Sequence, residues 1–504
     1  MMITHIYDFL EKSVAKFGEK IAFVEPFAKE RKELTYKDFD LNSKKLASEI
    51  LRSLGSDNPA QEPILIILPK GIDCLISFFG VARSGNFYTL LDEKSPKERV
   101  EKVLEILKPK LFITAKNLKF NLNIPTLYTE DFESFSINES LIEVAKERHI
   151  DTNLLYVFFT SGSTGIPKGV SIAHKSVIDY AFHFCETFQL NENEIIANQA
   201  PLYADASLPD ILATIKPAAT LHLLPNHLFA FPNKILECLE QEKITMIFWK
   251  PTVLIYFVQD KENLKNYPLN RLNKILVGGE IMPIKQLNIW RKHLPNALFA
   301  NCYGPTEITD VCCYYILDRE FSESEILPIG KAYKNTELLV FDEDMKLISP
   351  KQTSVKGELF VRGSSLSLGY YNDKEKTAKA FIQNPLHNHY LDLLYRTGDI
   401  VAYNELGELL CYGRNDNRIK YMGHRIELEE IESVINSHQK VILCACIFKE
   451  KIICFYESEE ELDFKAFLKD KLPSYMLPKN FIRIGKFKLN QNSKINRKAL
   501  YELV

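Results

Sequence analysis

The sequence has no apolar run of the roughly 18–20 residues that a membrane-spanning helix requires. Its N-terminus, MMITHIYDFLEKSVAKFGEK, carries Asp and Glu early and lacks the continuous apolar segment of a signal peptide. The net charge is only −3, so no excess of positive charge favours nucleic acid or an anionic membrane surface. These absences predict a cytoplasmic protein that neither inserts into membranes nor binds nucleic acid.

The ten cysteines include no CxxC pair and no Cys/His spacing of the kind that holds structural zinc. They are scattered through apolar stretches, and two of them stand in CAC at 444–446. Free cysteine is among the most frequently buried residue types. We therefore predict reduced cysteines in the hydrophobic core.

Two common glycine patterns of nucleotide-binding proteins are also missing. The segment FFTSGSTGIPKG (158–169) follows an apolar strand, but Gly169 follows Lys168 where a Walker A loop requires Ser or Thr. The pattern G-x-G-x-x-G is absent too, because Gly162 is followed by Ser163 and Thr164. Gly, Ser, Thr and Pro also build ordinary solvated turns. The loop alone leaves phosphate binding and a simple turn open.

A length of 504 residues exceeds one hydrophobic core, so at least two domains are expected. Short apolar runs alternate with helical patterns through the first three fifths of the chain. We predict strands at 64–69, 110–115, 154–160, 220–225, 244–251, 274–279 and 297–304, and helices at 71–85, 233–243 and 284–294. This alternation indicates an α/β fold of doubly wound, mostly parallel sheets flanked by helices. Ligands of such folds bind beyond the carboxyl ends of the strands.

The pattern changes from about Leu338, where closely spaced strands predict a small antiparallel β appendage. After Arg414 a polar, charged stretch leads into a helix and a pair of strands, which indicates a small α+β unit. We place the boundary at Asp416. The predicted domains are 1–415, a nucleotide-binding core, and 416–504, a smaller C-terminal domain.

Several motifs resemble, in order, those of the adenylate-forming superfamily, which includes acyl-CoA synthetases, luciferases and amino-acid adenylation domains. These motifs are LTYKDFDLNSKKLA (34–47), LLDEKSPKER (90–99), TSGSTGIPKG (160–169), NCYGPTE (301–307), GELFVRGSSLSLGYYN (357–372), YRTGD (395–399), YGRNDNRIKYMGHRIELEEIE (412–432) and LNQNSKINRKAL (489–500). The resemblance spans nearly the whole chain. It implies a ligase that uses ATP and Mg²⁺ to convert a carboxylic acid into its adenylate.

The resemblance assigns an ATP site to residues of these motifs. The implied ATP-binding residues are Thr160, Ser161, Gly162, Ser163, Thr164, Gly165, Lys168, Gly279, Glu280, Asn301, Cys302, Tyr303, Gly304, Pro305, Asp399, Tyr412 and Arg414. Within this set Tyr303 stacks near adenine and Asp399 accepts hydrogen bonds from the ribose hydroxyls. Thr306 contacts the α-phosphate, and Glu307 holds Mg²⁺. Taken one at a time, each acid also fits a surface turn.

Two further positions are implied by the terminal motifs. Lys494 matches the catalytic lysine whose charge stabilises the transition state of adenylation. Ser493 before it replaces the usual Gly. Asp416 matches the hinge about which the small domain rotates between the two half-reactions. Asn417 next to it departs from the commoner Gln or Asp.

Asp205, in PLYADASLPDIL (201–212), matches the aspartate that pairs with the α-ammonium of the substrate in amino-acid adenylation domains. The alternative is that Asp205 or Ser207 caps the helix that follows. Other matched pocket positions include Gly278, Asp310 and Val311. Asp310 either pairs with a substrate side-chain amine or turns toward solvent.

The chain resembles a stand-alone amino-acid adenylation enzyme of the non-ribosomal peptide synthetase or D-alanine–carrier protein ligase type. It ends four residues after the terminal motif, which predicts a separate carrier protein whose phosphopantetheine thiol accepts the aminoacyl group. Gly278 and Asp310 depart from the D-alanine enzymes, which commonly have Cys and an apolar residue there. An acyl-CoA synthetase for a non-amino acid and a catalytically idle binding protein are the rival interpretations.

Overall fold

The structure is a computed structural model that describes residues 3–55, 61–160, 166–259, 262–323, 325–414, 418–488 and 495–504. The chain forms two compact units. The first comprises residues 1–93, 109–158 and 170–413, and the second comprises 94–108, 159–169 and 414–504. The predicted boundary residue Asp416 lies outside the described residues, so the division into 1–415 and 416–504 stays a prediction.

A nine-stranded sheet forms the centre of the first unit. Its order is β15 (Lys331–Ala332), β14 (Cys313–Ile316), β13 (Leu298–Tyr303), β12 (Lys274–Gly278), β11 (Met246–Trp249), β9 (Ile195–Asn198), β10 (Thr220–Leu223), β1 (Ile21–Glu25) and β2 (Lys32–Thr35). Strands β13 through β1 in this order pair in parallel, whereas β14, β15 and β2 pair antiparallel at the edges. The predicted parallel α/β sheet is confirmed.

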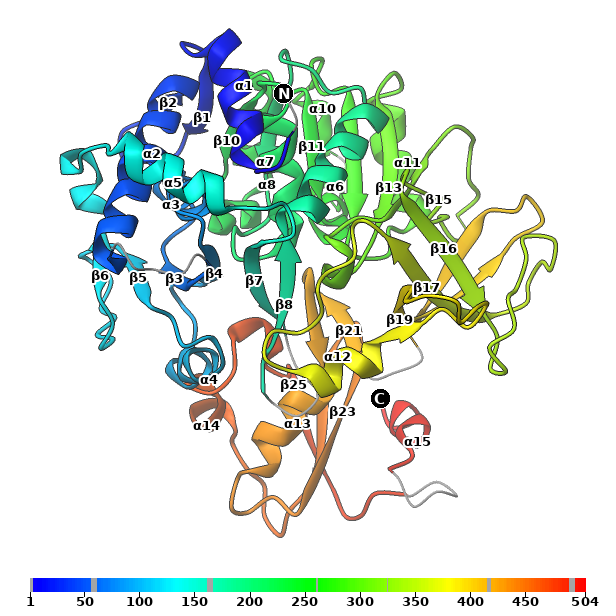
Figure 1. Cartoon of the computed structure of the whole chain (residues 1–504). Coiled ribbons are helices and arrows are strands. Elements are labelled where there is room, and N and C mark those ends of the chain that lie inside the picture. The colour runs from blue at the N-terminus through cyan, green and yellow to red at the C-terminus, as the bar shows by residue number, and fades with distance from the viewer. Residues whose placement is uncertain are drawn as a thin grey trace. The chain divides into compact units, whose positions relative to one another are not determined.

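Helices cover this sheet because their apolar sides match its buried strands. Figure 1 shows α8 (Pro232–Gln241) and α11 (Ile284–His293) beside β11 and β13. Leu236 and Trp290 of these helices are fully buried in a cluster with Trp249 of β11. Proline at the first position of α8 and of α9 (Pro251–Phe257) suits a helix start, since its missing N–H has no partner there.

A six-stranded sheet lies beside the first helices of the chain. Its order is β6 (Thr126–Tyr128), β5 (Leu111–Thr114), β3 (Pro63–Ile67), β4 (Phe87–Leu91), β7 (Leu154–Thr160) and β8 (Lys168–Ala173). All five residues of β3 and of β4 are buried, as expected for parallel strands covered on both faces. Gly80 of α3 (Ile72–Arg83) allows close approach to α2 (Tyr36–Leu54), because a Cβ there would lie 2.7 Å from a Leu46 methyl.

The predicted antiparallel appendage is also confirmed. Its strands run in the order β16 (Thr336–Phe341), β17 (Gly357–Gly363), β19 (Leu393–Tyr403) and β18 (Phe381–Gln383), and β20 (Leu409–Arg414) pairs with β19. The remaining α-helices of the first unit are α1 (Tyr7–Phe17), α5 (Glu139–Arg148), α6 (His174–Thr187), α7 (Leu208–Ile215), α10 (Glu262–Lys265) and α12 (Lys374–Ala380).

The second unit has its own core, drawn mostly in orange and red in Figure 1. It contains α4 (Lys97–Leu107), the hairpin β21 (Arg418–Tyr421) and β22 (His424–Glu427), the sheet β23 (Leu443–Lys449), β24 (Lys451–Glu457) and β25 (Asn480–Ile484), and the helices α13 (Leu428–Asn436), α14 (Lys465–Lys469) and α15 (Arg497–Tyr501). The α+β prediction is confirmed, with β24 and β25 pairing in parallel.

The cysteines occupy the cores, as predicted. Cys444, Cys446 and Cys454 are buried across β23 and β24, and all ten cysteines are free thiols, of which only Cys411 is half-exposed. None of the helices in the described ranges has the length and hydropathy needed to cross a membrane.

Candidate active site

The topology brings the predicted site residues to one edge of the nine-stranded sheet. The strand order reverses at β9: β10 and β1 lie on one side, and β11, β12 and β13 lie on the other. Ligands of open α/β sheets bind at such a reversal, beyond the carboxyl ends of the strands. Asp205 follows β9, Glu280 follows β12, and Thr306 follows β13.

Tyr303 and Asp399 are joined directly. The Tyr303 hydroxyl donates a hydrogen bond to Asp399 Oδ2, although the two residues are 96 positions apart, and both are buried. Burial and the charge of Asp399 raise the pKa of the Tyr303 phenol well above its usual value. Tyr303 therefore stays protonated and donating. Asp399 is fixed further by its own backbone N–H, which donates to Thr397 Oγ1 at 3.0 Å.

Glu307 is fully buried in a short 3₁₀ turn, Thr306–Ile308. The Tyr370 hydroxyl donates to Glu307 Oε1 at 2.7 Å. Sequence reasoning did not single out Tyr370, although it stands in the motif that ends GYYN. Among the described residues, no group of three or more His, Cys, Asp and Glu is arranged to hold a metal ion. The assignment of Mg²⁺ to Glu307 stays a prediction.

Asp205 begins the 3₁₀ turn Asp205–Ser207 that precedes α7. Its carboxylate accepts a hydrogen bond from the Ala206 backbone N–H at 3.0 Å, and the nearby Thr306 side chain acts to lower its pKa. Burial is the largest influence on its pKa, which is raised, and the nearby charge of Glu307 raises it further. The capping alternative is not supported, because α7 begins after Ser207 with no side-chain cap. Asp205 thus carries an ionisable group where its charged form is costly.

Lys250 is a site residue that the sequence reasoning missed. It directly follows β11 and is buried. Burial lowers the pKa of its ammonium group, while the charges of Glu280, Asp205 and Asp310 act in the opposite direction. The sequence offered one signal for Lys250: it directly follows the apolar run IFW, at the carboxyl end of a predicted parallel strand, where ligands of such sheets bind. Lys250 lies among three carboxylates at this edge.

Glu280 and Gly279 follow β12. Glu280 accepts hydrogen bonds from the backbone N–H of Thr252, at 3.1 Å, and from its hydroxyl, which fixes the start of α9. Gly279 has a positive φ of 85°, a conformation that glycine adopts without strain. Both were predicted ATP contacts. What Glu280 contacts here is a helix N-terminus.

Of the other predicted substrate positions, Gly278 ends β12, whereas Asp310 and Val311 lie between β13 and β14. Gly278 pairs with Cys302 in the β12–β13 register, and a Cβ on Gly278 would lie 2.9 Å from the Cys302 carbonyl oxygen and 3.0 Å from the Phe248 ring. Val311 is buried, and Asp310 beside it is partly accessible. The charge of Asp310, together with burial, raises the pKa of the Cys302 thiol.

Other predicted ATP-binding residues make local contacts. The Asn301 amide donates to the Pro328 carbonyl oxygen at 2.8 Å, and Pro305 precedes the turn that holds Thr306. The Tyr412 side chain is 41% exposed, with the Lys356 ammonium 4.5 Å from its ring centre. Gly304 approaches the backbone of Asp310 closely.

The rest of the predicted set belongs to the second unit. Lys168 is buried, and its ammonium pairs with Glu427 of β22 at 3.1 Å. Thr160 ends β7, and Arg414 ends β20, with its side chain outside the described part. Five loop residues, Ser161, Gly162, Ser163, Thr164 and Gly165, lie outside the described residues, as do Asp416 and Lys494.

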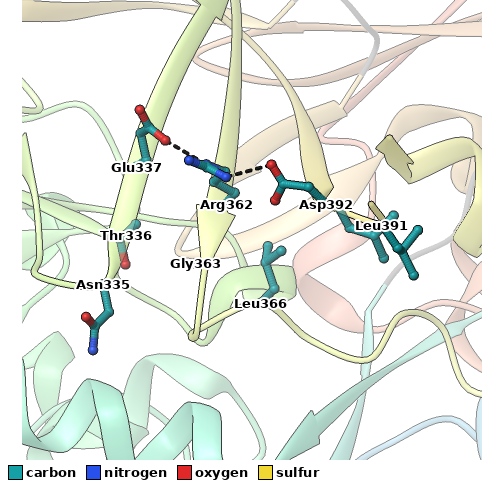
Figure 2. Close-up of a pocket in the computed structure, with 9 residues that line it drawn as sticks. Asn335, Thr336, Glu337, Arg362, Gly363, Leu366, Leu391 and Asp392 are labelled. Carbon is teal, nitrogen blue, oxygen red and sulfur yellow. Dashed lines mark hydrogen bonds and ion pairs between the residues drawn. The ribbon is translucent and has the colours of Figure 1, made fainter. Parts of the chain in front are cut away.

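A separate hollow of about 570 Å³ lies in the antiparallel appendage. Figure 2 shows Arg362 at its wall, paired with Glu337 on one side and Asp392 on the other, each at 2.6 Å. None of the predicted site residues lines this hollow. Two carboxylates share one guanidinium there, and the site beyond the parallel strands, where the predicted residues gather, is the better candidate.

Comparison with known proteins gives consistent matches. The model of a family described as AMP-binding enzyme matches residues 10–371. The chain is 31% identical to zwittermicin A synthase ZmaJ of Bacillus cereus, over 99% of this chain and 95% of that protein. It is 28% identical to gramicidin S synthase 1 of Brevibacillus brevis, over 99% of this chain but only 44% of that protein. The chain therefore spans less than half of this larger relative.

Solved structures share the fold. PA1221, a non-ribosomal peptide synthetase protein containing adenylation and PCP domains, matches with a TM-score of 0.84 and 20% identity, over 99% of this chain and 84% of that one. o-Succinylbenzoate CoA synthetase from Bacillus subtilis matches with a TM-score of 0.81 and 19% identity, over 98% of each chain.

Proposed function

The chain belongs to the family of AMP-binding enzymes, and we propose that it activates an amino acid and passes it to a separate carrier protein. At the coarser level it is an adenylate-forming enzyme of the non-ribosomal peptide synthetase type, and such enzymes use ATP. In the proposed first step, a carboxylate oxygen of the amino acid bonds to the α-phosphorus of ATP. The bond from that phosphorus to the β-phosphate oxygen breaks, and pyrophosphate leaves.

Two anions meet in this step, so the protein must hold them in line and offset their charge. The buried pair of Tyr303 and Asp399 provides a fixed aromatic ring and a carboxylate for the nucleoside. Thr306 presents a hydroxyl beside Asp205 for the phosphate and carboxylate. We assign the positive charge that offsets the charge of the transition state to Lys494.

Magnesium fits the residues at Glu307. The buried carboxylate, held by Tyr370, and the neighbouring Thr306 hydroxyl are hard oxygen ligands, and Mg²⁺ is commonly bound by one or two carboxylates together with substrate phosphates. Bound there, Mg²⁺ would neutralise phosphate charge. Tyr370 orients the carboxylate that would hold it.

The observation that carries the amino-acid assignment is the environment of Asp205. Its carboxylate is half-buried, burial raises its pKa, and Glu307 adds a second negative charge nearby. An α-ammonium group would stabilise the charged carboxylate and would itself need a carboxylate partner in a desolvated site. A fatty or aryl acid has no cation to offer. The site therefore favours an amino acid.

In the proposed second step, the phosphopantetheine sulfur of a carrier protein attacks the carbonyl carbon of the adenylate. The bond from that carbon to the phosphate oxygen breaks, AMP leaves, and the thiol proton passes to solvent. We propose that the smaller domain reorients about Asp416 between the steps. The adenylation and PCP domains that PA1221 contains support a carrier as partner.

ATP–pyrophosphate exchange tests the first step directly. It should be driven by one or a few amino acids when all of them, in both enantiomers, are compared with fatty and aryl acids. D-alanine alone would identify the chain with the D-alanine–carrier protein ligases. Exchange driven as well by the matching deamino acid would contradict the proposal and favour an acyl-CoA synthetase.

Asp205→Asn tests the ammonium contact. Breaking a buried ion pair costs on the order of 3–5 kcal/mol, or roughly two to three decades in kcat/KM. The loss should affect the amino acid, leave the affinity for ATP nearly unchanged, and remove the disadvantage of the deamino acid. Asp210→Asn is the matched control, because this buried carboxylate already accepts a hydrogen bond from the Asn198 amide at 2.8 Å. It should keep the preference for the amino acid.

A further inference from the structure

The backbone holds Asp310 in a defined turn. Thr309 and Asp310 both have positive φ, 60° and 69°. The Thr309 hydroxyl donates to the Ser365 carbonyl oxygen at 2.7 Å, and the Val311 N–H donates to the Thr309 carbonyl oxygen at 3.1 Å. Two successive left-handed residues persist only where surrounding contacts determine them. The backbone at Asp310 is therefore held by the fold.

The Asp310 carboxylate acts on the protein interior. Burial is the largest cause of the raised pKa values of Tyr180, Tyr333 and Cys302, and the charge of Asp310 adds to each. The same charge supports the protonated form of buried Lys250. These residues come from different elements. The sequence left two alternatives for Asp310: its carboxylate pairs with a substrate side chain or turns toward solvent. Its electrostatic effect on these buried groups favours the first alternative.

Aromatic rings connect Asp310's surroundings to the predicted substrate pocket. Phe248, against which Gly278 packs, lies 6.2 Å from Phe184 between ring centres. Phe184 lies 5.4 Å from Tyr180, and Tyr180 lies 6.1 Å from Tyr333. Tyr180 is therefore separated from Phe248, beside Gly278, by the single ring of Phe184, and Tyr333 lies next to Tyr180.

The hydroxyls of these tyrosines lack protein partners. Tyr180 and Tyr333 are 2% and 4% exposed, and within the described part of the chain neither phenol oxygen has a hydrogen bond. The same holds for Tyr156, whose pKa is raised by burial and also by the charges of Asp205 and Asp310. Native proteins leave few buried polar groups unsatisfied, because each is costly. Several in one neighbourhood indicate a polar occupant.

We propose that the activated amino acid carries a side-chain N–H or O–H donor, which Asp310 accepts while Tyr180 and Tyr333 complete its hydrogen bonds. A carboxylate only accepts hydrogen bonds, so its occupant must donate, whereas phenol hydroxyls both donate and accept. Hydroxyl, carboxamide and ammonium groups meet this requirement. Hydrocarbon side chains do not. The inference rests on the proposed function and narrows its substrate class.

Exchange assays with matched side chains test this. The pairs are serine and 2-aminobutyrate, threonine and valine, asparagine and leucine, and ornithine and norleucine. A site built to bond a polar group rejects the analogue that lacks it by about 10⁴-fold in kcat/KM. We expect the polar amino acid of one pair to exceed its apolar partner in kcat/KM by about that factor. That pair then identifies the chemical group that donates to Asp310. Preference for an apolar member overturns this inference but leaves amino-acid activation standing, whereas equal use of the deamino acid contradicts the proposed function itself.

Variants separate binding from structure. Tyr180→Phe and Tyr333→Phe should each reduce the polar-to-apolar ratio by at least about tenfold, with little loss of exchange for the apolar member. Asp310→Asn should reduce it further. Tyr36→Phe is the matched control, since the Tyr36 hydroxyl already donates to the carbonyl oxygens of Thr214 and Ala219 at 2.8 and 2.7 Å. It should lower the melting temperature and keep the ratio. An unchanged ratio in both tyrosine variants overturns the inference.

Discussion

Replacing Gly304 with alanine should damage the site through the backbone alone. Gly304 stands in YGPTE between Tyr303 and the Thr306 turn. A Cβ at this position would lie 2.0 Å from the Asp310 carbonyl oxygen and 2.8 Å from Val311 Cα. Both obstacles are main-chain atoms, so no side chain can rotate away. The two segments must separate by at least about 1 Å to reach even a tight contact.

Such overpacking usually costs about 1–3 kcal/mol of folding free energy. A misplacement of about 1 Å can also lower catalysis about 10²-fold. We expect Gly304→Ala to lower the melting temperature by a few degrees and ATP–pyrophosphate exchange by about two decades. The loss should raise KM for the amino acid, because the displaced segment carries Asp310 and Val311.

Two other glycines provide the comparison. In Gly278→Ala the new Cβ would lie 2.9 Å from the Cys302 carbonyl oxygen and 3.0 Å from the Phe248 ring, so a smaller effect is expected than in Gly304→Ala. Gly485→Ala meets nothing within 4 Å and requires no left-handed backbone, so it should behave as wild type. A Gly304→Ala protein with wild-type stability and exchange would refute the reasoning, as would an equal loss in Gly485→Ala.

Three further outcomes are expected. Lys494→Ala should nearly abolish exchange while ATP still binds, because its charge acts on the transition state; exchange within a few-fold of wild type would contradict this. Asp416→Pro should preserve exchange and reduce transfer to the carrier, since a fixed φ restricts a pivot; equal losses in both would argue against a hinge. Burial lowers the pKa of His149 to about 4, and burial with the charges of His149 and His5 lowers the pKa of His174 well below 6.5. Below about pH 6.5 the unfolded chain therefore binds more protons than the folded protein. The free energy of unfolding should fall as the pH is lowered from about 6.5 to about 4. His149→Gln should remove part of that fall, up to about 3 kcal/mol in urea titrations, and an unchanged pH dependence would speak against it.

The parallel sheets were predictable because their strands are buried on both faces and read as apolar runs. The strand at 154–160 was placed at its observed bounds, and those at 244–251 and 297–304 within two residues or so. Strands β1 and β2 were not predicted. β1 pairs with β10, so that Phe23 lies opposite Leu221. A local sequence pattern does not predict a strand partner that is so distant along the chain.

The same limit applies to the candidate site. Motifs supplied Tyr303, Glu307 and Asp399, because each sits in a short recognisable stretch. The groups that hold them came from elsewhere: Tyr370 bonds Glu307 across 63 positions, and Lys250 lies within the electrostatic reach of three acids on other segments. Spacing along the chain carries no information about such contacts, which depend on how strands are ordered.

The antiparallel appendage is consequently part of the candidate site. Asp399 lies on β19 and bonds Tyr303 at the end of β13, while Tyr370, from the segment between β17 and β18, bonds Glu307 in the turn after β13. The Ser367 N–H also donates to the Glu307 carbonyl oxygen at 2.9 Å, and the Thr309 hydroxyl bonds Ser365. Each contact joins the YGPTE segment, or Thr309 just after it, to the appendage through a buried polar group, whose loss would leave its partner unsatisfied. A change that loosened the appendage would therefore act first on the nucleotide half of the site, before it reached the pocket around Asp205.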